Sequence, residues 1–169
     1  QAFLSGPVEE LLAMIDEFEL GNSKHIPQDV IDFLGKNKFF SMIIPKKSGG
    51  LEFSPYANST VVATIAATSG AIAVTVMVPN SLGPGELLMH YGTEAQQNYW
   101  LPKLSIAQDI PCFALTSPEA GYDFGSIPDA GIVSKGIWDG KEVIGLRVTC
   151  DKRYITSVYV KHITLRNIS

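Results

Sequence analysis

Apolar residues in the first hundred positions recur at the spacing of helices rather than of strands. From Val8 to Leu20 they fall on one helical face, with the acidic residues largely elsewhere and Gly21 as the expected end. Pro27 suits the first turn of a second helix. The expected buried stripe of this second helix consists of Val30, Ile31 and Leu34.

Helix start signals recur further along the chain. Ser54 is an N-cap residue followed by Pro55 at the first helical position, and Gly70 divides the long helical stretch that they open. A further helix is expected over Leu82–Tyr91. The sequence Thr93–Gln96 has the form of a capping box and predicts the start of the next helix.

One uncharged stretch, Val61–Val78, reaches the length of a short membrane span. Polar residues interrupt it, and Pro79 ends it without a basic anchor at either edge. A buried helix or pair of helices is therefore favoured over a membrane span.

Beyond about Asp109 the pattern changes to β-branched and aromatic residues with partial alternation. The expected strands are Pro111–Thr116, Gly131–Trp138, Val143–Thr149 and Tyr154–Leu165. Asp139-Gly140 is a two-residue hairpin turn between the middle two. The sequence thus predicts an α+β fold, with an all-helical N-terminal domain over residues 1–108 and a small, incomplete antiparallel β domain over residues 109–169.

The composition is that of a folded protein without a nucleic-acid surface. Hydrophobic residues make up 46% of the chain and charged residues 18%, and the formal net charge of −4 comes without a basic run. Cys112 and Cys150 lie among apolar neighbours without CxxC spacing, which predicts two buried reduced thiols and a cytoplasmic location. The three histidines lie far apart and lack carboxylate or cysteine neighbours at ligand spacing, so no metal site is expected.

The stretch Cys112–Ser126 is the most informative part of the sequence. A short apolar segment ends at the hydroxyls of Thr116 and Ser117, and a turn-forming loop with Pro118 and several glycines follows. Such a loop presents backbone N–H groups and small donors along one edge, as is needed to hold a flat heterocycle and an adjoining phosphate.

Three segments, in order along the chain, resemble the flavin-dependent acyl-CoA dehydrogenases. Tyr91–Leu104 has the wording Tyr-Gly-Thr-Glu-x-Gln and then Leu-Pro-x-Leu. Ala114–Ser126 reads Ala-Leu-Thr-x-Pro-x-Ala-Gly-x-Asp-x-x-Ser, and Lys152–Ser157 is similar to the second flavin strand of that family. The Thr-Ser-Pro-Glu-Ala-Gly wording and the continuation Ile127–Asp129 are most similar to the large bacterial β-oxidation enzymes.

The resemblance implies a cofactor, a substrate and a set of binding residues. Members of the family use FAD to oxidise acyl-CoA thioesters to trans-2-enoyl-CoA; a glutamate takes the α-proton while the β-hydrogen leaves as hydride to N5 of the flavin. By the resemblance, Thr116 meets the pyrimidine edge with its hydroxyl and N–H, Thr156 reaches N5, and Tyr154 packs near the ring where the family usually has tryptophan. The implied cofactor-binding residues are Thr116, Ser117, Gly121, Tyr122, Tyr154 and Thr156. Thr116 and Thr156 would also suit ordinary strand positions, because they are β-branched.

Two residues depart from the pattern. Ser117 replaces the common glutamate, although the large bacterial subgroup shares the serine. Tyr122 stands where the family has a small serine that bonds FAD phosphate or the CoA arm. A phenol does not fit the space of a hydroxymethyl group unless the loop moves or the groove is blocked.

The resemblance covers Phe39 to about Thr156, less than half of a family unit, and Ser157–Ser169 no longer follows the pattern. In the family a C-terminal helical bundle carries the catalytic glutamate and closes the acyl pocket. The chain is therefore expected to lack the catalytic base and to be a truncated acyl-CoA dehydrogenase-like protein, weakly active or inactive alone. The alternative is a non-catalytic interaction module, homo-oligomeric through the exposed strand edges or apolar face of an incomplete β domain.

Overall fold

The computed structural model describes residues 1–81, 83–138 and 140–155. These residues form two compact units, Gln1–Cys112 and Phe113–Ile155. Every α-helix of the described residues lies in the first unit, and the described sheet lies in the second. The predicted α+β class, with helices first and an antiparallel β segment after them, is confirmed.

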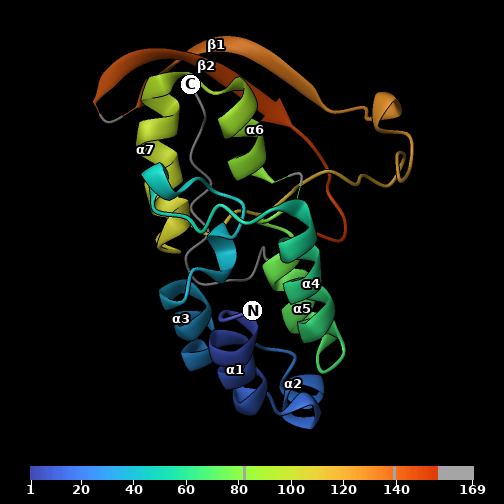
Figure 1. The fold of residues 1–169 in the computed structure, drawn as a ribbon. Coiled ribbons are helices and arrows are strands. Elements are labelled where there is room, and N and C mark those ends of the chain that lie inside the picture. The colour runs from blue at the N-terminus through green and yellow to red at the C-terminus, as the bar shows by residue number, and fades with distance from the viewer. Residues whose placement is uncertain (82, 139, 156–169) are drawn as a thin grey trace. The chain divides into compact units, whose positions relative to one another are not determined.

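The first unit is built from helices and short helical turns (Figure 1). In chain order these are η1 (Leu4–Val8), α1 (Glu9–Met14), α2 (Glu17–Ser23), α3 (Gln28–Lys36), η2 (Phe39–Ser41), η3 (Lys46–Ser48), α4 (Pro55–Ala66), α5 (Gly70–Met77), α6 (Pro84–Tyr91) and α7 (Glu94–Ser105). Within this unit α4 packs along α5, α6 packs against α7, and α1 packs against α3.

The predicted helix starts are confirmed by their caps. The Ser54 hydroxyl accepts a hydrogen bond from the N–H of Ala57 at the start of α4, where Pro55 is the first helical residue. At α7 the Thr93 hydroxyl accepts from the N–H of Gln96, whose side-chain oxygen accepts in return from the N–H of Thr93, so both halves of the capping box are present.

The single helix predicted over Val8–Leu20 is wrong. The chain is extended at Ile15, which separates α1 from α2. Asp16 then caps α2, because its Oδ1 accepts a hydrogen bond of 3.0 Å from the N–H of Glu19. Gly21 consequently lies inside α2 and does not end it. An aspartate followed three residues later by glutamate is itself a capping signal, and here it overrides the continuous apolar spacing.

Most buried apolar side chains of the first unit form one cluster. Its members are Val8, Leu11, Val30, Ile31, Leu34, Phe39, Phe40, Met42, Val61, Ile65, Ile72, Ala73, Val76 and Ile110. The predicted stripe of α3 is part of this cluster. A second, smaller cluster joins Ile44 to Leu101 and Leu104 of α7. Each fully buried side chain of this size stabilises the fold by about 1.5–3 kcal/mol, so this core holds the helices together.

The uncharged stretch Val61–Val78 forms parts of two helices. α4 ends at Ala66, and Ser69 caps α5 by accepting a hydrogen bond from the N–H of Ile72. The expected helix pair is therefore present. Across the part of the chain that the structure describes, no helix combines the length and the apolar character needed to cross a membrane.

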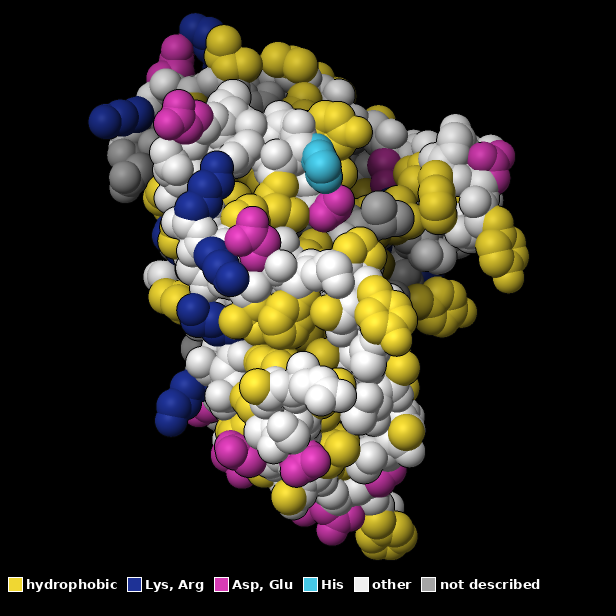
Figure 2. Space-filling model, in the orientation of Figure 1, with side chains coloured by type: hydrophobic (Ala, Val, Ile, Leu, Met, Phe, Trp, Pro, Cys, Tyr) yellow, Lys and Arg dark blue, Asp and Glu magenta, His cyan; other side chains and the backbone are white. Residues whose placement is uncertain are grey.

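Carboxylates gather at the end of the helical unit that α1 and α2 form, toward the bottom of Figure 2. Glu9 and Glu10 occupy the first turn of α1, and Glu17 and Glu19 occupy the first turn of α2. Negative side chains at helix N-termini are favourable because the helix dipole is positive there. These residues thus stabilise two short helices.

The second unit is organised around one hairpin. Strands β1 (Ala130–Trp138) and β2 (Lys141–Thr149) pair antiparallel from Ala130 with Thr149 to Trp138 with Lys141, as predicted. Gly140 has φ +74°, the left-handed conformation that its turn position requires, whereas its partner Asp139 lies outside the described residues.

The other two predicted strands have a different outcome. Residues 111–116 form no ladder with any described strand, so a strand over Pro111–Thr116 is wrong. Of Tyr154–Leu165 only Tyr154 and Ile155 are described, and neither lies in a strand.

Candidate functional site

Two of the motif segments lie side by side in the second unit. The N–H of Arg153 donates a 2.9 Å hydrogen bond to the carbonyl oxygen of Thr116. Next to it, Nζ of Lys152 donates a 2.8 Å hydrogen bond to the carbonyl oxygen of Leu115 and forms an ion pair with Asp129. The Lys152 and Asp129 side chains are only 14% and 20% exposed, so this pair is shielded from water. The second segment is thereby fastened to the first through both backbone and side chain.

Thr116 and Ser117 carry polar groups that no described residue satisfies. Thr116 is half-buried, and neither its N–H nor its hydroxyl has a hydrogen-bond partner among the described residues. Ser117 is 3% exposed; its backbone exchanges hydrogen bonds of 3.3 and 3.2 Å with Ala120, but its Oγ has no partner within the described chain. An unsatisfied buried hydroxyl costs about 1–3 kcal/mol, which a ligand or water in this position would offset.

The loop that follows carries the remaining residues of this motif on the surface. Gly121 and Tyr122 are exposed, and the Tyr122 side chain is fully exposed. Asp123 shapes the next turn, η4 (Phe124–Ser126), by accepting hydrogen bonds from the N–H of Gly125 and the hydroxyl of Ser126. The loop therefore holds the Tyr122 phenol in solvent and away from the buried Ser117.

The second segment contributes two implied flavin-binding residues, and the structure describes Tyr154 but not Thr156. Tyr154 is 92% exposed and has φ +57°, a left-handed conformation that is uncommon for a bulky residue. Thr156, the residue expected to reach flavin N5, lies outside the described residues. The structure therefore brings together Thr116, Ser117 and the backbone of Arg153, and leaves Tyr122 and Tyr154 on the surface.

Thr116 presents its backbone N–H and its hydroxyl, and Ser117 presents a second hydroxyl beside them. Such a row can donate to and accept from the carbonyl and N–H groups on one edge of a planar heterocycle. Lys152 is occupied by Leu115 and Asp129, so it supplies rigidity rather than a free charge.

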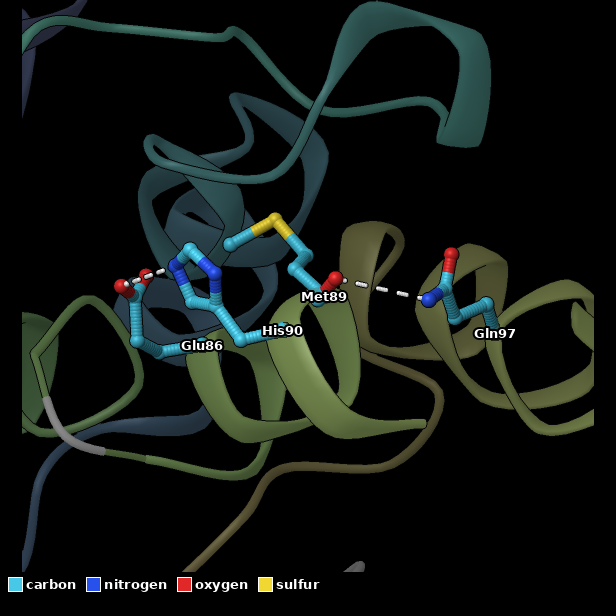
Figure 3. Close-up of polar contacts among 4 residues, drawn as sticks. All are labelled: Glu86, Met89, His90 and Gln97. Atoms are coloured by element: carbon cyan, nitrogen blue, oxygen red, sulfur yellow. Dashed lines mark hydrogen bonds and ion pairs between the residues drawn. The ribbon is translucent and has the colours of Figure 1, made fainter. Parts of the chain in front are cut away.

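A histidine–carboxylate pair that sequence reasoning missed lies on α6. Nε2 of His90 is 2.9 Å from Oε1 of Glu86, one helical turn earlier, and Gln97 of α7 donates a 3.4 Å hydrogen bond to the carbonyl oxygen of Met89 (Figure 3). The expectation that no histidine has a carboxylate neighbour at ligand spacing is wrong for His90, and the i, i+4 spacing of the two residues is the signal in the sequence. Within residues 1–81, 83–138 and 140–155, no group of three His, Cys, Asp or Glu residues is placed to hold a metal ion.

The two cysteines are free, as expected, but they are not both buried. Cys112 is half-buried, and burial raises the pKa of its thiol, an effect that a backbone hydrogen bond partly opposes. Cys150 directly follows β2 and is exposed, so neither thiol is fully buried and the expectation of two buried thiols is wrong.

The family model of the acyl-CoA dehydrogenase N-terminal domain matches residues 7–107, from η1 through α7. This chain belongs to the acyl-CoA dehydrogenase family. The match confirms the resemblance inferred from the three motifs. It ends before Cys112, so the match rests on the helical unit and is independent of the Thr116 loop.

Two curated relatives extend the comparison past the helices. The chain is 30% identical over 138 residues to (2S)-methylsuccinyl-CoA dehydrogenase of Cereibacter sphaeroides, covering 82% of this chain and 23% of the relative. It is 34% identical over 119 residues to the caffeyl-CoA reductase–Etf complex subunit CarC of Acetobacterium woodii, covering 70% and 31%. The chain thus spans between about a quarter and a third of these relatives.

The fold agrees with solved structures of the family. The structure of an acyl-CoA dehydrogenase from Bacillus anthracis, complexed with FAD, matches with a TM-score of 0.65 at 17% sequence identity, over 90% of this chain and 24% of that one. At this identity the match shows the fold. The helical unit followed by an antiparallel β segment is therefore an acyl-CoA dehydrogenase arrangement.

Proposed function

We propose that this chain forms the N-terminal part of an FAD-dependent acyl-CoA dehydrogenase that introduces an α,β double bond into fatty acyl-CoA thioesters. Family membership and the acyl-CoA names of the relatives support the substrate class. The observation that carries the proposal is the hydrogen bond between Arg153 and Thr116, which fastens the two flavin motif segments to each other.

The polar groups of the Thr116 loop fit a flavin edge. The N–H and hydroxyl of Thr116 and the buried Oγ of Ser117 have no partners among the described residues, and the pyrimidine edge of FAD offers carbonyl oxygens and an N–H. Thr116 would hold this edge and Ser117 would add a hydrogen bond from beside it. The Bacillus anthracis structure of the same fold is complexed with FAD, which supports flavin as the class of cofactor.

These contacts suggest a separate role for each residue of the site. FAD, when bound, supplies the acceptor for the β-hydrogen of the thioester. Thr116 and Ser117 orient the cofactor by hydrogen bonds, and Lys152 keeps their loop in place through Leu115 and Asp129. Thr156 would complete the set near N5, and Tyr154 would pack near the ring.

We expect the chain to be weakly active or inactive by itself. It spans 23% and 31% of the two relatives, and the family's glutamate base belongs to the part of the pattern that the resemblance does not cover. Loss of a proton-transfer group costs on the order of 10²–10⁴ in rate. Fatty acid β-oxidation in the cytoplasm is the proposed setting. The two free cysteines support the reducing compartment only.

Flavin binding tests this proposal directly. The purified chain is titrated with FAD and followed by flavin fluorescence, beside the variant Thr116→Val, which removes one hydroxyl and keeps the shape. The matched control is Thr149→Val at the exposed end of β2. We expect Thr116→Val to weaken FAD binding about tenfold, the effect of one good hydrogen bond, and Thr149→Val to leave it unchanged. An equal affinity for all three proteins contradicts the assignment of Thr116.

A second function, that of a non-catalytic module that associates with itself, is favoured by one observation. The hairpin carries many large apolar side chains that are more than half exposed, and in the described residues each of its strands pairs only with the other. Exposed apolar surface and unpaired strand edges both favour association. This function requires no flavin and is compatible with the first.

A further inference from the structure

Lys152 is held between one carbonyl oxygen and one carboxylate. Its Nζ donates a 2.8 Å hydrogen bond to the carbonyl oxygen of Leu115 and pairs with Oδ2 of Asp129. Because the two charged side chains are only 14% and 20% exposed, little water competes for the ammonium group. A hydrogen bond from a charged donor is roughly twice as strong as one between neutral groups, so the Leu115 carbonyl is strongly polarised.

The carbonyl of Leu115 and the N–H of Thr116 belong to the same peptide group. Resonance couples them, so a donor that draws electron density toward the oxygen makes the N–H more acidic and a stronger donor. The peptide is trans, so its oxygen and its N–H point in opposite directions. Lys152 therefore lies at one edge of this peptide, and the N–H is presented at the other edge.

The next peptide group is polarised in the same sense, but its donor is already used. The carbonyl of Thr116 accepts from the N–H of Arg153 at 2.9 Å, and the N–H of that same peptide, on Ser117, donates to the carbonyl oxygen of Ala120 at 3.3 Å. The N–H of Thr116 has no partner within the part of the chain that the structure describes. Of these two polarised N–H groups, that of Thr116 is thus the one available to a ligand.

We propose that Lys152 is a positioning residue that acts on the ligand through Thr116. It fixes the Leu115 peptide and strengthens the Thr116 N–H as a hydrogen-bond donor, while Asp129 holds the ammonium group in place. The ligand group that such a donor recognises is an electron-rich carbonyl oxygen on a planar ring. The proposal rests on the proposed function in taking this oxygen from the pyrimidine edge of FAD.

A purely structural role of the ion pair predicts a different result. If Lys152 and Asp129 only fastened the loop, removal of either side chain would loosen it, and both changes would act in the same direction. If Lys152 polarises the peptide, loss of the cation weakens the Thr116 N–H, whereas loss of the carboxylate leaves the cation uncompensated and strengthens it. The two halves of one ion pair therefore separate the two explanations.

Amide hydrogen exchange at Thr116 measures this acidity in the full chain without flavin. Exchange at neutral pH begins when hydroxide removes the amide proton, so a more acidic N–H exchanges faster. Lys152→Met removes the cation, and Asp129→Asn removes the carboxylate but keeps an acceptor oxygen for Lys152. By NMR, we expect Thr116 to exchange about tenfold faster in Asp129→Asn than in Lys152→Met, the effect of one nearby charge at intermediate dielectric. Equal rates in the two variants overturn the proposal.

Three further variants complete the exchange experiment. Lys135→Met is the matched control, because it also removes a lysine from an ion pair, but from the far more exposed pair with Glu142. It should leave exchange at Thr116 unchanged, and an effect as large as that of Lys152→Met overturns the proposal. Lys152→Arg keeps a cationic donor and should exchange like the unchanged chain. If Lys152→Met loses the amide signals of the folded hairpin, Lys152→Gln, which has a neutral donor, takes its place.

Titration of the same proteins with FAD reports separately on the proposed dehydrogenase function. We expect Lys152→Met to bind FAD about tenfold more weakly than the unchanged chain, and Lys152→Arg to restore most of the affinity. An exchange contrast without FAD binding by any of the proteins would refute flavin as the ligand and support the action of Lys152 on Thr116. An absent contrast overturns that action whether or not FAD binds.

Discussion

Arg153 donates its backbone N–H to the carbonyl oxygen of Thr116 at 2.9 Å. The two residues belong to different motif segments, and between them the chain forms the entire β1–β2 hairpin. Because the bond uses main-chain atoms, substitutions at either residue leave it in place, apart from proline at position 153, which would remove the donor. The neighbouring Lys152 side chain is therefore the part of this junction that mutation can change.

Lys152→Met should loosen the Thr116 loop. It removes the donor to the Leu115 carbonyl and leaves the Asp129 carboxylate, only 20% exposed, without its cation. We expect a loss of about 1–3 kcal/mol in stability, between the values for exposed and buried pairs, and weaker FAD binding. Chemical unfolding and FAD titration measure both. Arg153→Met, which removes an exposed pair with Asp151 and keeps the backbone bond, serves as the control and should change neither.

Asn80 joins segments of the helical unit that are far apart in sequence. Its Nδ2 donates to the carbonyl oxygens of Phe39 and Val76, at 2.5 and 2.9 Å, and its Oδ1 accepts from the N–H of Ile43 at 3.3 Å. Asn80→Ala should therefore lower the free energy of unfolding by about 2–4 kcal/mol, because it leaves buried backbone groups unpaired. Urea unfolding checks this. Asn98 is an exposed residue of α7, so Asn98→Ala should change stability by less than about 0.5 kcal/mol, and equal losses would contradict the role of Asn80.

The helical unit was largely predictable because its signals are local. Caps such as Thr93 and starts such as Ser54 involve residues within four positions, so the sequence carries them directly. The break at Ile15 is harder to predict because the continuous apolar spacing favours one helix, whereas the capping pattern of Asp16 favours a new start.

The candidate site was less predictable because its contacts are not local. The motifs indicate Thr116 and Ser117. The hydrogen bond from Lys152 to Leu115, however, joins two residues that are 37 positions apart, and it forms only when the loop folds back. Likewise, the apolar composition of residues 111–116 predicted a strand, although strand pairing requires a partner that composition does not reveal.

Two glycines predict opposite effects of the same substitution. A Cβ at Gly50 would lie 2.1 Å from the carbonyl oxygen of Ile44, and backbone atoms cannot yield cheaply. Gly50→Ala should therefore destabilise the chain by several kcal/mol, on the order of the larger single-residue effects. At Gly70, the first residue of α5, a Cβ would meet nothing within 4 Å, so Gly70→Ala should stabilise by about 0.4–1 kcal/mol. Thermal unfolding of the two variants measures both effects. A shift of the melting temperature in the same direction for both variants would contradict this prediction.

The alkylation rates of the two thiols should depend differently on pH. The thiolate is the reacting species, and burial raises the pKa of Cys112, so its rate should rise only at higher pH than that of an ordinary thiol. Below its pKa Cys112 stays protonated and reacts slowly, whereas Cys150 is exposed and open to reagent. The variant Cys150→Ser isolates Cys112, and Cys112→Ser isolates Cys150, so each profile can be recorded by iodoacetamide labelling and mass spectrometry. Unfolding in urea should bring the Cys112 profile to that of a free thiol; a profile that is already ordinary in the folded chain would show that the thiol is not desolvated.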